Sequence, residues 1–170
     1  MANKIFQYRP SDFERTKIIQ REFLSFLFGE LNKLPWFNLD IDHELQLTMQ
    51  NLDKFAEPDG RLFLVETDGQ IAATISLRKI RDNCGEIKRM YVKPQFRGKN
   101  IGALMIEEVI KVSNNNGYSD LYLDTAQFMS SAVSLYKKFG FQETEPYPES
   151  VNPNGYWDKW IFMTKKLKSS

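Results

Sequence analysis

The sequence has very few residues of the kinds that build disulfides, metal sites and nucleophilic catalytic pairs. Cys84 is the only cysteine and His43 the only histidine among 170 residues. A single cysteine cannot form an intramolecular disulfide, which fits a reducing compartment. A histidine-rich metal site is excluded, and so is any Ser/His or Cys/His catalytic pair that does not use His43. We therefore expect no metal.

The chain also lacks an excess of charge and a long apolar run. Its 23 Lys and Arg balance 22 Asp and Glu, so the net charge of +1 gives no general attraction to nucleic acid or membranes. No apolar run approaches the roughly 18 residues that a membrane helix requires. The segment 1–7 lacks the apolar core of a signal peptide. These absences predict a cytoplasmic protein without nucleic-acid or membrane partners.

The residues that are present suffice for one folded domain. A chain of 170 residues, 42% of them apolar, can bury a proper core. No repeat, low-complexity stretch or linker interrupts it. We therefore expect a single domain over residues 1–170.

Apolar periodicity and turn residues predict a mixed α/β order of elements. Asp40 or Asp42 is a suitable cap for the second helix, and Asp68-Gly69 is typical of a tight hairpin turn. Because helices separate the later strands, we expect a parallel pairing there. The predicted elements are a strand at 5–9, a helix from 10–12 onward, a second helix to 52, three meandering strands at 62–66, 71–77 and 86–92, a helix at 100–115, a strand at 121–124, a helix ending at Gly140, a strand from Phe141 and a last strand at 157–164.

The most informative segment is a connection between strand and helix that is rich in glycine and cations. Gly98 and Gly102 let a ligand approach the backbone closely, and Arg97 and Lys99 add positive charge. The helix that follows has unpaired backbone N–H groups and a partial positive charge at its N-terminus. An ordinary turn can have the same glycines. The combination nevertheless suits a pyrophosphate.

Two motifs resemble those of the GNAT superfamily of N-acetyltransferases. Residues 95–100, Gln-Phe-Arg-Gly-Lys-Asn, resemble the acetyl-CoA motif Q/R-x-x-G-x-G/A. Asn100 departs from the motif, although Asn tolerates left-handed backbone angles better than most residues. Residues 132–141 resemble the family's A-x-x-L-Y-x-x-x-G-F helix. The spacing of the motifs and the order of elements fit as well, so the resemblance covers essentially the whole chain.

The resemblance implies an α/β (α+β) fold and acetyl-CoA as cosubstrate. The fold would be a mixed, mostly antiparallel twisted sheet of about seven strands, flanked by four helices. In the family, the strand before the loop leaves its parallel neighbour at a bulge and binds the pantetheine arm through its backbone, here at Met90 and Val92. Lys88-Arg89 disturbs the alternation of this strand, as a bulge would. The residues expected to hold the pyrophosphate are Arg97, Gly98, Lys99, Asn100, Ile101 and Gly102.

The resemblance also implies direct attack of an amine on the thioester. This agrees with the lack of a visible Ser or Cys nucleophile paired with a base. Tyr136 occupies the position of the general acid, because a phenol keeps its proton at neutral pH and can donate it to a thiolate. Its alternative role is a packed aromatic side chain. Glu86 is the candidate base, and water is the alternative base. If Glu86 has no catalytic role, we expect it to form a surface ion pair with Lys88 or Arg78.

Met129 is the clearest departure from the family pattern. Many members have an Asn there, whose side chain bonds the cofactor. A Met side chain cannot replace that contact. Either Ser130 or Ser131 takes it over, or the contact is absent.

The acceptor amine is less well defined by the sequence. Aromatic faces and carboxylates in two segments predict a small cationic amine, because both attract a cation. The alternatives are a protein N-terminus or lysine as acceptor, or a non-catalytic CoA-binding module. The oligomeric state, monomer or homodimer, stays open. The residues expected at the acceptor are Trp36, Phe37, Asp40 and Asp42, with Glu145, Tyr147, Glu149, Trp157 and Asp158.

Overall fold

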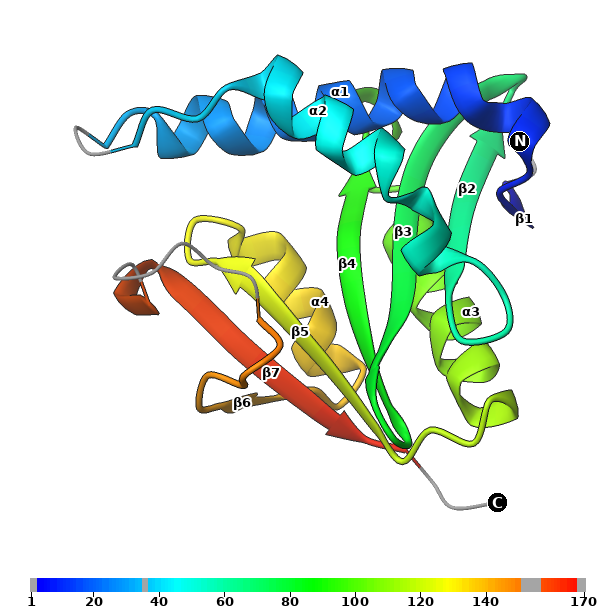
Figure 1. Cartoon of the computed structure of the whole chain (residues 1–170), viewed down its shortest axis with the longest axis vertical. Helices are drawn as coiled ribbons and strands as arrows, with labels where there is room; N and C mark the ends of the chain where they lie inside the picture. Colours follow the sequence, from blue (N-terminus) through cyan, green and yellow to red (C-terminus); the bar gives the residue numbers. More distant parts are fainter. Residues whose placement is uncertain (1–2, 35–36, 151–156, 168–170) are drawn as a thin grey trace. The chain divides into compact units, whose positions relative to one another are not determined.

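The described residues form a seven-stranded sheet with four α-helices (Figure 1). The computed structural model describes residues 3–34, 37–150 and 157–167. The strand order is β1-β2-β3-β4-β5-β7-β6. Contacts divide the chain into an N-terminal unit, Met1–Ser76 with Arg89–Ile101, and a C-terminal unit, Leu77–Lys88 with Gly102–Ser170. The expected α/β fold with a mixed sheet is confirmed.

The strands of the N-terminal unit begin with an antiparallel pair. Strand β1 (Lys4–Gln7) pairs with β2 (Arg61–Thr67), from Lys4 opposite Glu66 to Gln7 opposite Phe63. A two-residue turn at Asp68 and Gly69 leads from β2 into β3 (Gln70–Arg81). Both turn residues have positive φ, 51° and 75°, as hairpin turns of type I′ require. The predicted hairpin is therefore confirmed.

Two α-helices complete the N-terminal unit and lie side by side in Figure 1. After a 3-10 turn at Pro10–Asp12, α1 spans Phe13–Leu31. Helix α2 spans Ile41–Gln50, and the Asp40 side chain accepts hydrogen bonds from its first amides, as predicted. A short 3-10 turn at Leu52–Phe55 follows. The apolar side of α1 joins a core cluster of Ile19, Leu64, Ile71 and Tyr91.

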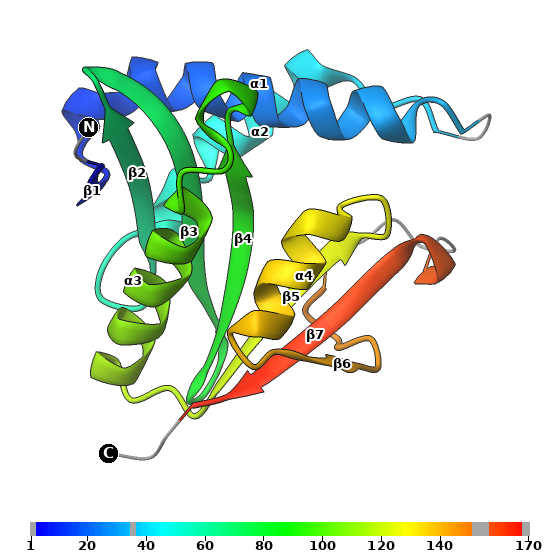
Figure 2. The same ribbon diagram turned by 180° about the vertical axis from the view of Figure 1, so that it is seen from behind.

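The C-terminal unit contains the parallel pairing that the sequence predicts. Strand β4 (Cys84–Val92) runs parallel to β5 (Asp120–Ala126), and α3 (Ile101–Asn115) separates them along the chain. Strand β7 (Trp160–Lys166) is antiparallel to β5 and also to the short β6 (Gln142–Thr144). Figure 2 shows α4 (Ser130–Lys138) in front of β5.

Some predicted boundaries were wrong for identifiable reasons. The last strand begins at Trp160 and not at Trp157, because β5 ends at Ala126, whose partner is Trp160. Residues Trp157–Lys159 instead form a 3-10 turn. Strand β3 continues four residues past the predicted end at Leu77, since it remains beside β4 in the sheet.

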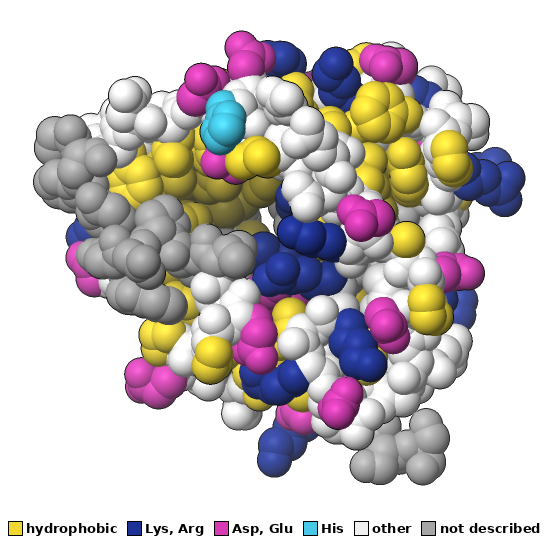
Figure 3. Space-filling model, in the orientation of Figure 1, with side chains coloured by type: hydrophobic (Ala, Val, Ile, Leu, Met, Phe, Trp, Pro, Cys, Tyr) yellow, Lys and Arg dark blue, Asp and Glu magenta, His cyan; other side chains and the backbone are white. Residues whose placement is uncertain are grey.

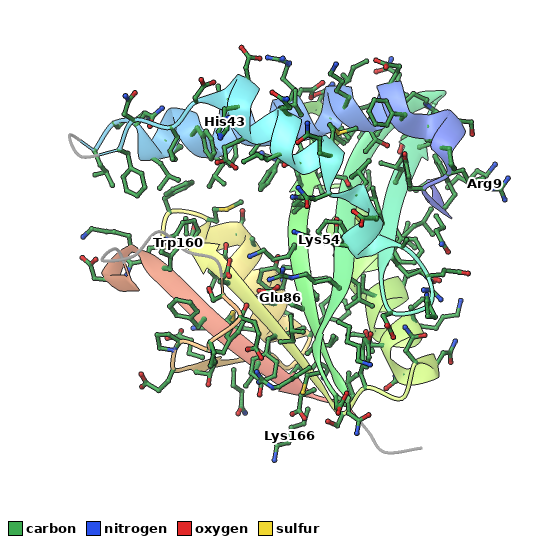
Figure 4. The ribbon with its side chains drawn as sticks, in the orientation of Figure 1. Arg9, His43, Lys54, Glu86, Trp160 and Lys166 are labelled. Carbon is green, nitrogen blue, oxygen red and sulfur yellow. The ribbon has the colours of Figure 1, made fainter. Side chains whose placement is uncertain are left out.

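The surface of the described residues matches the balanced composition. Figure 3 shows Lys and Arg side chains interspersed with Asp and Glu over the visible face. The single histidine, His43, is exposed on α2 (Figure 4), and Cys84 is buried. Within the described ranges, no helix has both the length and the apolar character to cross a bilayer. The same ranges contain no group of three His, Cys, Asp or Glu arranged to hold a metal.

Candidate active site

The glycine-rich loop has the backbone of a ligand-binding turn. Gly98 has φ of 74°, and Asn100 has φ of 61°, which confirms that Asn100 adopts the left-handed angle. A Cβ atom built on Gly98 would meet nothing within 4 Å. Packing therefore does not require the glycine, whereas the backbone angle does, and open space lies beside the loop. Helix α3 begins directly afterwards at Ile101.

The cations of this loop contact aromatic rings. The Arg97 guanidinium lies 5.3 Å from the Phe26 ring centroid, and its Nε donates to the Val92 carbonyl at 3.1 Å. The Lys99 ammonium lies 5.2 Å from the Phe96 ring. Because a ring orients a cation without neutralising it, both charges remain available to an anion.

One backbone amide of the loop already has a partner. The Arg97 amide donates to the Pro94 carbonyl at 3.2 Å, within a 3-10 turn at Pro94–Phe96. Arg97 therefore offers a ligand its side chain, whereas the amides that follow belong to the loop and to the first turn of α3.

Strand β4 has an interruption where the bulge was expected. Its parallel register with β5 runs from Cys84 opposite Asp120 to Ile87 opposite Leu123. Two residues beyond Ile87, Arg89 has φ of 54°, although it lies inside the strand. A left-handed residue within a strand is typical of a bulge. The neighbouring backbone groups of Met90 and Val92 are those predicted to meet the pantetheine arm.

Glu86 is fully buried and bonded through both carboxylate oxygens. Arg78 Nε donates to Oε2 at 2.5 Å, and the Tyr147 hydroxyl donates to Oε1 at 2.6 Å. The Lys88 ammonium lies 3.6 Å from Oε1. Both ion-pair partners named from the sequence are present, but Glu86 itself is buried and the two cations are partly buried, so these are not surface ion pairs. Figure 4 labels Glu86 where it leaves β4.

A second carboxylate, Asp124, extends this arrangement and was not predicted as a site residue. Lys88 Nζ lies 3.0 Å from Asp124 Oδ2, and the Ser150 hydroxyl donates to the same oxygen at 2.9 Å. The Tyr147 hydroxyl lies 3.4 Å away. We call these residues the polar cluster of the C-terminal unit: Arg78, Glu86, Lys88, Asp124, Tyr147 and Ser150.

The polar cluster fastens the loop that follows β6. Arg78 Nη2 donates to the Glu149 carbonyl at 3.0 Å, and Arg81 Nη1 donates to the Glu149 carboxylate at 2.5 Å. The Arg81 bond lowers the pKa of Glu149. With the bonds of Tyr147 and Ser150, side chains from three strands hold this loop.

Tyr136 is buried on α4, with 5% of its surface exposed. Its ring meets Phe141 nearly edge-on, with 5.8 Å between centroids. Burial first, and the charge of Asp124 second, raise the pKa of Tyr136 above its ordinary value. The phenol therefore keeps its proton at neutral pH, as a general acid must. The same burial also fits a packing residue.

The position of the missing family asparagine has a local contact. Met129 directly precedes α4, and its sulfur accepts a hydrogen bond from Thr125 Oγ1 at 3.6 Å. Ser130 and Ser131 are exposed in the first turn of α4. Both serines are therefore open to solvent, whereas the Met129 sulfur is bonded to Thr125 of β5.

The residues predicted at the acceptor mostly have partners within their own unit. Asp42 pairs with Arg21 at 2.6 Å, Asp158 with Lys159 at 2.8 Å, and Asp40 caps α2. Phe37 is buried and Glu145 exposed. Trp36 and the side chain of Trp157 lie outside the described residues. These contacts are typical of residues that stabilise their own segments. The cationic acceptor therefore stays a prediction.

Comparison with known proteins assigns the fold and the loop to one family. Residues 26–141 match the sequence model of the acetyltransferase (GNAT) family. The chain belongs to the GNAT acetyltransferase family. It is 32% identical over 155 residues to an uncharacterized N-acetyltransferase of Schizosaccharomyces pombe, covering 85% of each chain. It is 30% identical over 118 residues to an IAA acetyltransferase of Azospirillum brasilense, covering 69% of this chain and 74% of that protein.

Solved acetyltransferase structures share the fold over nearly the whole chain. A GNAT-family acetyltransferase from Staphylococcus aureus Mu50 has a TM-score of 0.79 and 25% identity, with 98% of this chain and 100% of that one covered. The PaiA N-acetyltransferase of Thermoplasma acidophilum, solved with coenzyme A, has a TM-score of 0.75, 20% identity and coverage of 98% and 99%. As a GNAT member, the protein is an N-acetyltransferase that depends on acetyl-CoA.

Proposed function

We propose that the protein transfers the acetyl group of acetyl-CoA to the primary amine of a small molecule. The loop at Gly98 is the observation that carries the acetyl-CoA part of this proposal. Its left-handed backbone faces open space, its cations contact rings, and a helix begins directly after it. Such a loop fits a pyrophosphate, because backbone N–H groups at a helix N-terminus bind anions.

Two backbone segments and one side chain would hold the donor. The pyrophosphate binds the amides from Gly98 to Gly102 and the Arg97 guanidinium. Met90 and Val92 bind the pantetheine arm as a neighbouring strand would, which the interruption at Arg89 supports. Ser131, exposed on α4, takes over the contact that Met129 cannot make.

Tyr136 and Glu86 would move the protons. The amine attacks the thioester carbonyl, so that a C–N bond forms and the C–S bond breaks. Tyr136 gives its proton to the sulfur, since a phenol is protonated at neutral pH before the reaction. Glu86 accepts the proton of the amine, with water as the alternative. No covalent enzyme intermediate is required.

An acceptor screen tests the proposal. Release of free thiol from acetyl-CoA is measured with amino acids, polyamines, aminoglycosides and peptides. Turnover that is highest with small amines supports the proposal. A preference for peptides would replace the small molecule by a protein acceptor. Binding of acetyl-CoA without turnover on any amine would contradict a catalytic role.

A further inference from the structure

Glu86 is held by groups from three different parts of the C-terminal unit. Arg78 reaches Oε2 from β3, while Tyr147 reaches Oε1 from the loop after β6, 61 residues along the chain. Lys88, two residues away on β4, lies 3.6 Å from the same Oε1. Because Glu86 has no exposed surface, these groups hold its carboxylate in place and surround its charge.

Tyr147 is fixed independently of its bond to Glu86. Its ring packs against Tyr122 at 5.1 Å and meets Phe162 at 6.1 Å and a right angle. Burial and the nearby carboxylates raise the pKa of Tyr147, so its hydroxyl keeps the proton that it donates. The rings therefore hold the hydroxyl against Oε1, and a phenylalanine would preserve the packing.

We propose that Tyr147 is a positioning residue for Glu86, whose hydroxyl holds the carboxylate and sets the pH at which Glu86 accepts a proton. A hydrogen bond to the charged form of an acid favours that form. Arg78 and Lys88 act in the same direction. Asp124 acts in the opposite direction through its charge, although Lys88 and Ser150 bind it. Of the groups bonded to Glu86, Tyr147 is the neutral one, so its hydroxyl can be removed without changing the charge of the cluster.

The effect of Tyr147 on catalysis depends on the proposed role of Glu86 as the base. Loss of the Tyr147 hydroxyl leaves the charged form of Glu86 less favoured. The carboxylate then takes up a proton at higher pH, and a base that is protonated cannot accept a proton from the amine. Tyr147→Phe should therefore move the acidic limb of kcat/KM upward by about one pH unit, because a hydrogen bond to a charged group contributes about a factor of ten.

The experiment compares two readouts in four proteins, with Glu86→Gln as a fifth protein for reference. The first readout is the pH dependence of kcat/KM. The second is the titration of the Glu86 carboxyl carbon, followed by 13C NMR and assigned through its loss in Glu86→Gln. The proteins are the wild type, Tyr147→Phe, Tyr122→Phe and Ser150→Ala. Tyr122→Phe removes a hydroxyl that interacts with Arg81, and Ser150→Ala loosens the loop at Asp124 without touching Glu86.

The proposal predicts an upward shift of both readouts in Tyr147→Phe alone. An unshifted Glu86 resonance in Tyr147→Phe would overturn it. An equal shift in Ser150→Ala would overturn it as well, because loop anchoring would then be the cause. If the resonance shifts but Glu86→Gln retains the acidic limb, Tyr147 still positions Glu86 and only the proposed base role fails.

Discussion

The glycine-rich loop and the polar cluster are opposite kinds of site. The loop is made of backbone, with left-handed residues at Gly98 and Asn100 and open space where a side chain would be. The cluster is made of buried side chains, and both oxygens of Glu86 have partners within the protein. The loop offers groups to a ligand, whereas the cluster satisfies its own groups.

Because of this difference, we expect substitutions in the loop to change ligand affinity and substitutions in the cluster to change folding stability. A backbone site loses ligand affinity when a side chain fills its space, while the fold outside the loop stays the same. A buried polar cluster loses folding free energy when one member is removed, because its partners remain buried without their bonds. The following variants test whether the two sites respond in these different ways.

The largest effect is expected at Tyr136, whose pKa is raised in part by Asp124 of the cluster. Tyr136→Phe should fold and bind acetyl-CoA normally but lower kcat by about 10²–10⁴-fold, the usual contribution of a general acid. Steady-state kinetics and calorimetry with acetyl-CoA give the two numbers. Tyr118→Phe, at a similarly buried tyrosine, is the control. A kcat for Tyr136→Phe within about a factor of two of the wild type would leave Tyr136 as a packing residue.

The next effect concerns the backbone site. Gly98→Val should weaken acetyl-CoA binding about tenfold or more, equivalent to about 1.4 kcal/mol, because a β-branched residue resists φ of 74° and fills the open space. Calorimetry measures the affinity.

Gly69→Val is the matched control for Gly98→Val. Gly69 has φ of 75° and equally open surroundings, but it lies in the β2–β3 turn. It should therefore suffer the same backbone strain and keep its affinity for acetyl-CoA. Equal affinities for both valine variants would show that the Gly98 loop does not bind the donor.

The polar cluster should respond in stability. Asp124→Asn should lower the free energy of unfolding by about 1–3 kcal/mol, because Lys88 loses the nearer of its two carboxylate partners and the remaining bonds weaken. Urea denaturation measures the change. Asp42→Asn removes an exposed partner of Arg21 and should cost only about 0–1 kcal/mol. A loss at Asp124 no larger than at Asp42 would mean that the cluster does not stabilise the fold.

The sequence predicts the loop better than the cluster for a physical reason. The angles of Gly98 and Asn100 depend on local backbone preferences, so residue type and spacing within a few positions suffice. The hairpin at Asp68-Gly69 and the cap at Asp40 were predictable for the same reason. Tyr147 and Glu86 meet across 61 positions, and no local pattern encodes that contact.

The boundaries that were missed have a similar origin. The start of β7 at Trp160 depends on where β5 ends, which is a property of the partner strand. The burial of Glu86 depends on Arg78 and on the loop after β6. Glu86 and Tyr147 were both singled out from the sequence, but only the fold shows that they bond to each other.

A smaller effect separates the two left-handed residues of the loop. Asn100→Ala should lower the free energy of unfolding by about 1 kcal/mol, because an alanine at φ of 61° lacks the local hydrogen bonds that let Asn adopt this angle. Asn100→Gly should not destabilise and should keep the affinity for acetyl-CoA. Thermal unfolding and calorimetry compare the variants. If Asn100→Gly binds markedly worse than the wild type, the Asn side chain contacts the donor directly.

The smallest effect concerns the acceptor. Glu149→Gln and Asp158→Asn should raise the KM of a cationic amine more than they lower kcat, because attraction of the ground state is the proposed role. Arg81 lowers the pKa of Glu149, and Lys159 lowers that of Asp158, so both carboxylates stay charged at neutral pH. The same cations offset their charges, so each change in KM should be only about a factor of two.

Glu107→Gln, at an exposed position on α3, controls for a general change of surface charge. A best acceptor that is an acidic amino acid or a phosphorylated amine would contradict the cationic prediction. An unchanged KM in both variants would instead assign these carboxylates to anchoring, in line with their partners.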